Sequence, residues 1–114
     1  MLGASAVPPN ASPANGFAIV TIDPILLTLR VEMRFANLAS NSTTAHLHCC
    51  SAPGFNSIVA IQAPSFVGFP TGFLTGTYDH TFDLTQGSIW NPAFVTSSGG
   101  TIPSAYFALT FGLD

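Results

Sequence analysis

The chain has 114 residues, of which 6% are charged, a size that suits one domain able to bury roughly two thirds of its unfolded surface. It contains no lysine, and Arg30 and Arg34 are its only cationic side chains, so it has no basic patch to neutralise the phosphates of a nucleic acid. No stretch reaches the roughly 18 to 20 apolar residues of a transmembrane helix.

Hydrophobic residues make up 47% of the chain and include ten phenylalanines. That share is high for a small domain with few charges to keep it soluble. We therefore expect part of the apolar surface to meet a protein partner or another copy of the chain.

The first half of the chain predicts two strands joined by a turn. Residues 7–15 contain three prolines, which suits an extended segment at a sheet edge. Residues 17–22 form a β-branched run that ends at Asp23-Pro24, where proline favours a turn. Apolar and polar residues then alternate over 25–35, which predicts a strand with one buried and one solvated face. The predicted buried residues are Ile25, Leu27, Leu29, Val31, Met33 and Phe35.

The opposite face of this strand carries Arg30, Glu32 and Arg34 in a line. Such a row on a solvated face is typical of a charge ladder between neighbouring strands. We therefore interpret both arginines as structural.

The second half predicts three further strands and one ambiguous segment. Residues 44–50 and 57–62 suit short strands. Residues 73–84 alternate again, with Leu74, Tyr78, His80, Phe82 and Leu84 on one side. Residues 104–114 fit both helical spacing and strand alternation, so a strand and a short helix both stay open there.

Short strands separated by frequent glycine and proline turns favour an all-β fold. The expected architecture is an antiparallel β-sandwich or barrel with Greek-key-like connections. A short helix near the C-terminus is compatible with it.

Several segments, in this order along the chain, resemble the CHRD (chordin-type) domain family. They are Leu2-Gly3, Val7-Pro8-Pro9, Ala14-Asn15-Gly16 with Ala18–Asp23, Thr44–His48, Ala52-Pro53-Gly54, and Gly76-Thr77-Tyr78 with Thr81–Leu84.

The resemblance implies one CHRD-like domain over residues 1–114, with a β-sandwich similar in outline to copper/zinc superoxide dismutase. It also implies a secreted or extracytoplasmic protein, whose signal peptide is absent from this chain. Two departures stand out. Ala6 lies where the family usually has an acidic residue, so no role tied to that carboxylate is carried over. The family also continues into further strands beyond residues 105–113, so we expect the last strands to be missing.

The sharpest chemical feature is the His46-x-His48 pair. Residues i and i+2 of a strand point to the same face, so two imidazoles can reach one metal ion. Further ligands would have to come from His80, Cys50, water or the histidine that the family carries in its last strands, and a thiolate beside imidazoles favours copper or zinc. The alternatives are a polar strand face for the pair and a hydrogen-bonded core position for His80. For Cys49 they are a small core residue or a disulfide.

Two functions follow from these features. The first is a structural or interaction β-domain that self-associates, or binds a protein partner, through strand edges and apolar surface that includes Phe66, Phe69 and Phe111. The second is a copper- or zinc-binding domain, with superoxide dismutase-like chemistry as its catalytic version. No triad order, phosphate loop or paired-carboxylate motif supports another enzyme.

Overall fold

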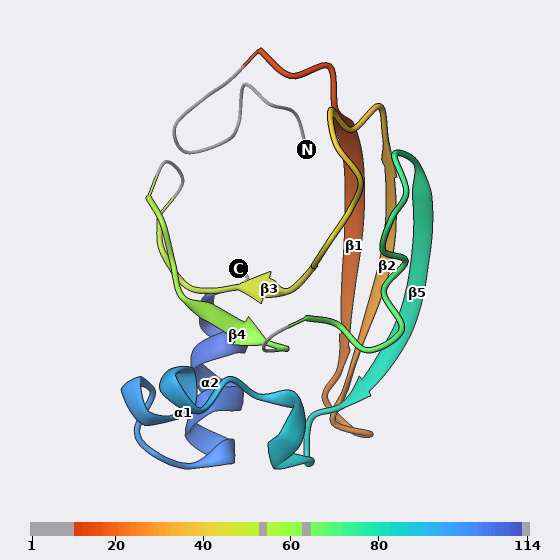
Figure 1. Cartoon of the computed structure of the whole chain (residues 1–114). Helices are drawn as coiled ribbons and strands as arrows, with labels where there is room; N and C mark the ends of the chain where they lie inside the picture. Colours follow the sequence, from red (N-terminus) through yellow and green to blue (C-terminus); the bar gives the residue numbers. More distant parts are fainter. Residues whose placement is uncertain (1–10, 53–54, 63–64, 113–114) are drawn as a thin grey trace.

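The computed structural model describes residues 11–52, 55–62 and 65–112, so part of the predicted lead-in segment at 7–15 lies outside it. Three long strands form one curved sheet, and the remaining elements gather on one side of it (Figure 1). The elements are β1 Asn15–Asp23, β2 Thr28–Ala36, β3 Leu47–His48, β4 Val59–Ile61, β5 Gly76–Asp83, a 3-10 turn at Gly87–Ile89, α1 Pro92–Ser97 and α2 Ile102–Gly112.

The large sheet has the order β1-β2-β5, and both pairings are antiparallel. β1 and β2 are neighbours in the chain and pair from Asn15 opposite Ala36 to Asp23 opposite Thr28. The alternation predicted for β2 is confirmed inside the strand, where Leu29, Val31 and Phe35 are buried and Met33 is half-buried.

The predicted start of this strand is wrong, because Ile25 and Leu27 lie in the turn between β1 and β2. The Asp23 side chain accepts hydrogen bonds from the backbone N–H groups of Ile25 and Leu26 at 2.9 and 3.0 Å. An aspartate that binds its own following backbone closes a local turn in competition with the strand. Ile25 is consequently 89% exposed.

The smaller sheet is shorter than its sequence suggested. β3 and β4 pair antiparallel over only two and three residues, although strands were expected at 44–50 and 57–62. Before β3, Ala45 bonds instead to the loop that follows β4. Its carbonyl accepts a hydrogen bond from the N–H of Phe66, and its N–H donates one to the Ser65 hydroxyl. These loop contacts replace a regular ladder.

The strand expected at 73–84 begins only at Gly76. Leu74 is 49% exposed, although the alternation placed it on the inner side. The carbonyls of Phe73 and Leu74 accept hydrogen bonds from the connection after β2, at Ser42 and Leu38. Their backbone therefore pairs with a loop and not with a neighbouring strand.

The ambiguous C-terminal segment is a helix, α2, and a second helix, α1, precedes it. Asn91 caps α1 by accepting a hydrogen bond from the N–H of Ala93 at 3.2 Å, and Pro92 occupies the first turn. An asparagine followed by proline is a common helix start, so the sequence carried a signal for α1. At α2, the Thr101 hydroxyl accepts a hydrogen bond from the N–H of Ser104, as at a helix N-cap.

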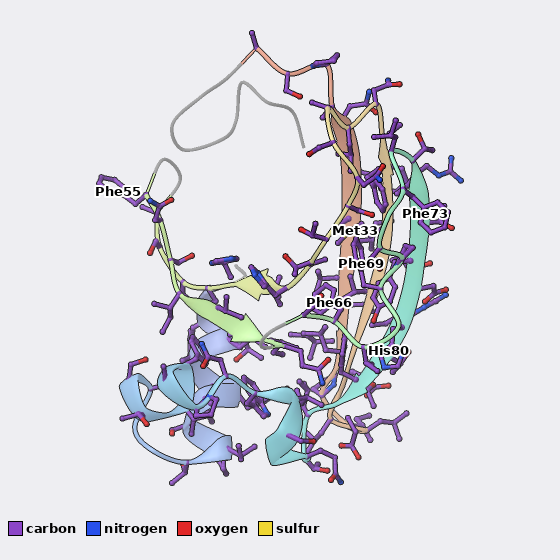
Figure 2. All side chains as sticks on the ribbon, in the orientation of Figure 1. Met33, Phe55, Phe66, Phe69, Phe73 and His80 are labelled. Carbon is purple, nitrogen blue, oxygen red and sulfur yellow. A yellow bond between two sulfur atoms is a disulfide. The ribbon has the colours of Figure 1, made fainter. Side chains whose placement is uncertain are left out.

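The core lies between the inner face of the large sheet, the small sheet and the helices. Aromatic rings form its centre. The ring of Phe66, labelled in Figure 2, stacks on that of Tyr78 with centroids 5.6 Å apart and lies 5.3 Å from that of Phe82. The buried apolar residues that make up this cluster are Leu29, Val31, Cys49, Ala60, Ile61, Phe66, Tyr78, Phe82, Leu84, Ile89, Trp90, Phe94, Ala105 and Leu109. The described chain is thus an antiparallel β-sandwich with helices at its C-terminal end, and a closed barrel is not seen in it.

Candidate functional site

The two histidines of the His46-x-His48 pair lie side by side, as their spacing predicts. Their ring centroids are 4.7 Å apart, in an edge-to-face arrangement. Both line an open hollow of about 540 Å³, together with Met33, Phe35 and Phe69. Ala45 and Leu47 pack against the core, and Ala45 also borders the hollow.

Burial acts on one imidazole of the pair, and a backbone carbonyl orients the other. Burial, followed by the proximity of His48, lowers the pKa of His46 below its usual 6.5. The Nδ1 atom of His48 lies 2.6 Å from the backbone carbonyl oxygen of Ser57. Because a carbonyl only accepts hydrogen bonds, Nδ1 carries a proton, and in the neutral form of the ring Nε2 is the nitrogen with the lone pair. A carbonyl that orients a histidine in this way is common behind metal ligands.

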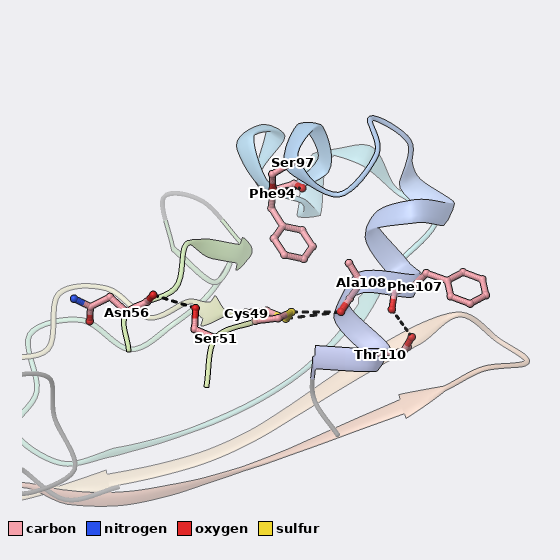
Figure 3. Close-up of a disulfide and its surroundings, with 9 residues drawn as sticks. Cys49, Ser51, Asn56, Phe94, Ser97, Phe107, Ala108 and Thr110 are labelled. Atoms are coloured by element: carbon pink, nitrogen blue, oxygen red, sulfur yellow. Dashed lines mark hydrogen bonds between the residues drawn. A yellow bond between two sulfur atoms is a disulfide. The ribbon is translucent and has the colours of Figure 1, made fainter. Parts of the chain in front are cut away.

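Cys50 is joined to its neighbour Cys49 by a disulfide. Cys49 is buried in the core, as one alternative held, and Cys50 is exposed. The Sγ atom of Cys50 lies 3.3 Å from the carbonyl oxygen of Ala108, so the pair rests against α2 (Figure 3). With its sulfur in a disulfide, Cys50 has no thiolate to offer a metal.

His80 is placed on β5 away from the hollow that the other two histidines line (Figure 2). It is half-buried on the inner face of the sheet, with its ring 4.6 Å from that of Phe82 and 6.1 Å from that of Tyr78. Within residues 11–52, 55–62 and 65–112, no three His, Cys, Asp or Glu side chains come together as a metal site would need. The structure thus joins two of the four predicted ligands.

The outer face of the large sheet is divided between charged and apolar residues. Arg30 forms two hydrogen bonds to the Asp79 carboxylate, at 2.7 and 2.9 Å, and an ion pair with Glu32 at 3.2 Å. The hydrogen bonds from Arg30 lower the pKa of Asp79. These contacts confirm the charge ladder across β2 and β5.

On β1 the same face exposes two apolar side chains between polar ones. Phe17 and Ile19 are 51% and 52% exposed, and the Arg34 guanidinium lies 5.9 Å above the Phe17 ring. Sequence reasoning missed both residues, because a β-branched run does not show which of its faces is covered. It also named Phe66 as exposed, which is wrong, because Phe66 packs in the aromatic core with 4% exposure. Phe69 is half-buried, and Phe111 is 70% exposed as expected.

Taken together, the fold defines an antiparallel β-sandwich domain with an apolar edge strand and a histidine pair beside an open hollow. Comparison with known families matches residues 1–89 to the CHRD domain. The chain belongs to the CHRD domain family, whose members are in general extracellular β-domains of the protein-interaction type. A search of curated proteins and one of solved structures found no match. Neither helix in the described part of the chain is long and apolar enough to span a bilayer.

Proposed function

We propose that this chain is an extracellular interaction domain that self-associates through β1, the edge strand of the large sheet. The observation that supports the proposal is that this long edge strand exposes two large apolar side chains. β1 is nine residues long and lies at the edge of the described large sheet, next to β2. An edge strand of this length with half-exposed Phe17 and Ile19 is a template for strand addition.

The sequence of β1 suits pairing with a second copy of itself. In an antiparallel pair centred on Ile19, each Ile19 would face its counterpart, and Phe17 would lie opposite Thr21. The strand has no charged residue before Asp23 at its end, so no like charges would oppose each other along the seam. Burying an isoleucine or phenylalanine side chain stabilises an assembly by roughly 1.5 to 3 kcal/mol. The product would be a continuous six-stranded sheet with two-fold symmetry.

A charge exchange at Ile19 tests this arrangement. Ile19→Lys and Ile19→Asp each place two like charges at the two-fold axis, so we expect either variant alone to be monomeric. Mixing the two variants places opposite charges there and should restore a dimer. Molar mass measured by analytical ultracentrifugation, over a range of concentrations, reports both results.

Ile58→Lys is the matched control, because Ile58 is another half-exposed isoleucine, 47% accessible, outside the large sheet. It should leave the molar mass unchanged. The proposal fails if the parent protein is monomeric at high concentration, or if the two Ile19 variants associate as the parent does.

A second candidate function is copper or zinc binding by His46 and His48. Their 4.7 Å ring separation and the orientation of His48 by the Ser57 carbonyl favour it. Two imidazoles leave the remaining coordination positions to water or to a ligand entering the hollow. With two protein ligands, we expect weaker binding than at a structural zinc site.

Titration calorimetry with Cu²⁺ and Zn²⁺ tests this second candidate. His46→Ala combined with His48→Ala should abolish binding, whereas Thr44→Ala, exposed two residues earlier, should not. Because the pKa of His46 is lowered, more than half of this imidazole is neutral at pH 6.5, where an ordinary histidine is half protonated. Affinity should fall as the pH is lowered, because protons compete with the metal for the imidazole nitrogens. Equal binding by the double variant would rule the site out.

A further inference from the structure

The turn between β1 and β2 exposes three consecutive aliphatic side chains at one end of the large sheet. Ile25, Leu26 and Leu27 are 89%, 69% and 37% exposed. Leu27 also has a φ of 54°, a left-handed conformation that a turn usually gives to glycine or asparagine. Exposure to water favours polar side chains in this turn, and the φ of Leu27 favours glycine or asparagine. We therefore expect the three aliphatic side chains to have a role outside the core.

Helix α2 continues this apolar surface. Phe107 and Phe111 are 62% and 70% exposed, and their rings stack at 5.8 Å. A groove of about 350 Å³ joins the helix to the turn, with Leu27, Phe107 and Tyr106 among its lining residues. In Figure 3, Phe107 points away from the side of α2 that holds the disulfide. We call Ile25, Leu26, Leu27, Phe107 and Phe111 the apolar end.

No charge lies within the apolar end. Residues 84–112 contain no acidic, basic or histidine side chain, and neither do residues 24–29. Two carboxylates flank it: Asp23 accepts hydrogen bonds from the N–H groups of Ile25 and Leu26, and Asp83 accepts them from the N–H and hydroxyl of Thr85. The carbonyl of Leu27 accepts a hydrogen bond from the N–H of Leu84 at 2.9 Å. Several backbone groups of the turn are thus already paired, which lowers the cost of moving the turn into a medium without water.

We infer that the apolar end inserts into the interfacial layer of an uncharged lipid bilayer. The exposed side chains come from a turn and a helix, and no charged side chain among them offers a protein partner an ion pair. A fluid acyl layer can surround all of them. The absence of lysine and arginine from the apolar end makes zwitterionic lipid a better match than anionic lipid, which attracts basic residues. The net charge of -3 also disfavours binding to anionic lipid, because like charges repel.

Sedimentation with phosphatidylcholine vesicles tests the inference on the full chain. We expect the parent protein to bind, with no gain when phosphatidylserine is added and little dependence on salt. Leu26→Asp and Ile25→Asp should each lower the partition coefficient about tenfold or more, because burying one such side chain is worth roughly 1.5 to 3 kcal/mol. In Leu26→Trp, tryptophan emission should shift to the blue on adding vesicles, since the native Trp90 is already buried.

Phe73→Asp is the matched control, because Phe73 is 55% exposed near the opposite end of the sheet (Figure 2). It should bind vesicles as the parent does. Repeating the assay in the Ile19→Lys background separates lipid binding from pairing through β1. The inference is overturned if the parent does not sediment with phosphatidylcholine, or if Leu26→Asp sediments equally well. It is also overturned if Leu26→Asp lowers the molar mass without lipid, which would assign the apolar end to a second copy.

Discussion

Phe82→Ala is expected to destabilise the domain by about 3 to 5 kcal/mol, the usual cost of deleting a buried aromatic ring. Phe82 is 1% exposed and contacts the rings of Phe66 and His80 at 5.3 and 4.6 Å. Its removal leaves a cavity where the large sheet meets the loop after β4. Urea unfolding at one fixed protein concentration measures the loss, because any self-association would also stabilise the fold.

Thr81→Ala provides the control on the same strand. Thr81 is exposed on the opposite face of β5, so its replacement should change the free energy of unfolding by less than about 0.5 kcal/mol. The loss expected for Phe82→Ala can unfold a small domain completely. In that case Phe82→Leu, expected to cost about 1 kcal/mol, keeps the test quantitative. Equal stability of Phe82→Ala and the parent would contradict the core described above.

Leu109→Ala is expected to cost about 2 to 5 kcal/mol and to affect the whole domain. Leu109 is fully buried on α2, as is Ala105 one turn earlier. The match to the CHRD domain covers residues 1–89, so both helices lie beyond it. The helices nevertheless supply Phe94, Ala105 and Leu109 to the same cluster that holds Phe82. We therefore expect one cooperative transition, not separate melting of the helices.

Phe107→Ala is the control for the helix. Phe107 is 62% exposed on the same helix, two residues before Leu109, so its truncation should barely alter stability. Circular dichroism at a helical wavelength and near-ultraviolet signals from the core should move together in Leu109→Ala. If the helical signal melts first while the core signal stays, α2 is an appendage and the prediction is wrong.

The contrast between Leu29 and Ile25 shows how far the alternation pattern reaches. From Leu29 onward, every second residue of β2 faces the core, because pairing with β1 and β5 on both sides keeps the backbone extended. Ile25 and Leu27 continue the same pattern in sequence, but they lie in a turn that the Asp23 side chain closes by accepting a backbone hydrogen bond. Alternation reports periodicity only, so it did not separate strand residues from turn residues of the same kind.

For the histidines too, the sequence pattern predicted local orientation but not tertiary contacts. Spacing alone placed His46 and His48 on one face, because side chains in a strand alternate. Whether His80 or Cys50 joins them depends on how β5 and α2 pack around β3. In the structure, His80 lies in the aromatic layer, and Cys50 is bonded to Cys49 against α2.

From its sequence alone, this chain was recognisable as an all-β member of the CHRD domain family, with the strand positions of the large sheet and the histidine pair. These features depend on local periodicity and on short segments in a fixed order. The tertiary structure decided that residues 102–112 are helical, that Phe66 is buried, and that Phe17 and Ile19 are exposed on an edge strand. Those outcomes depend on which distant segments cover a given face, and such long-range contacts leave no period in the sequence.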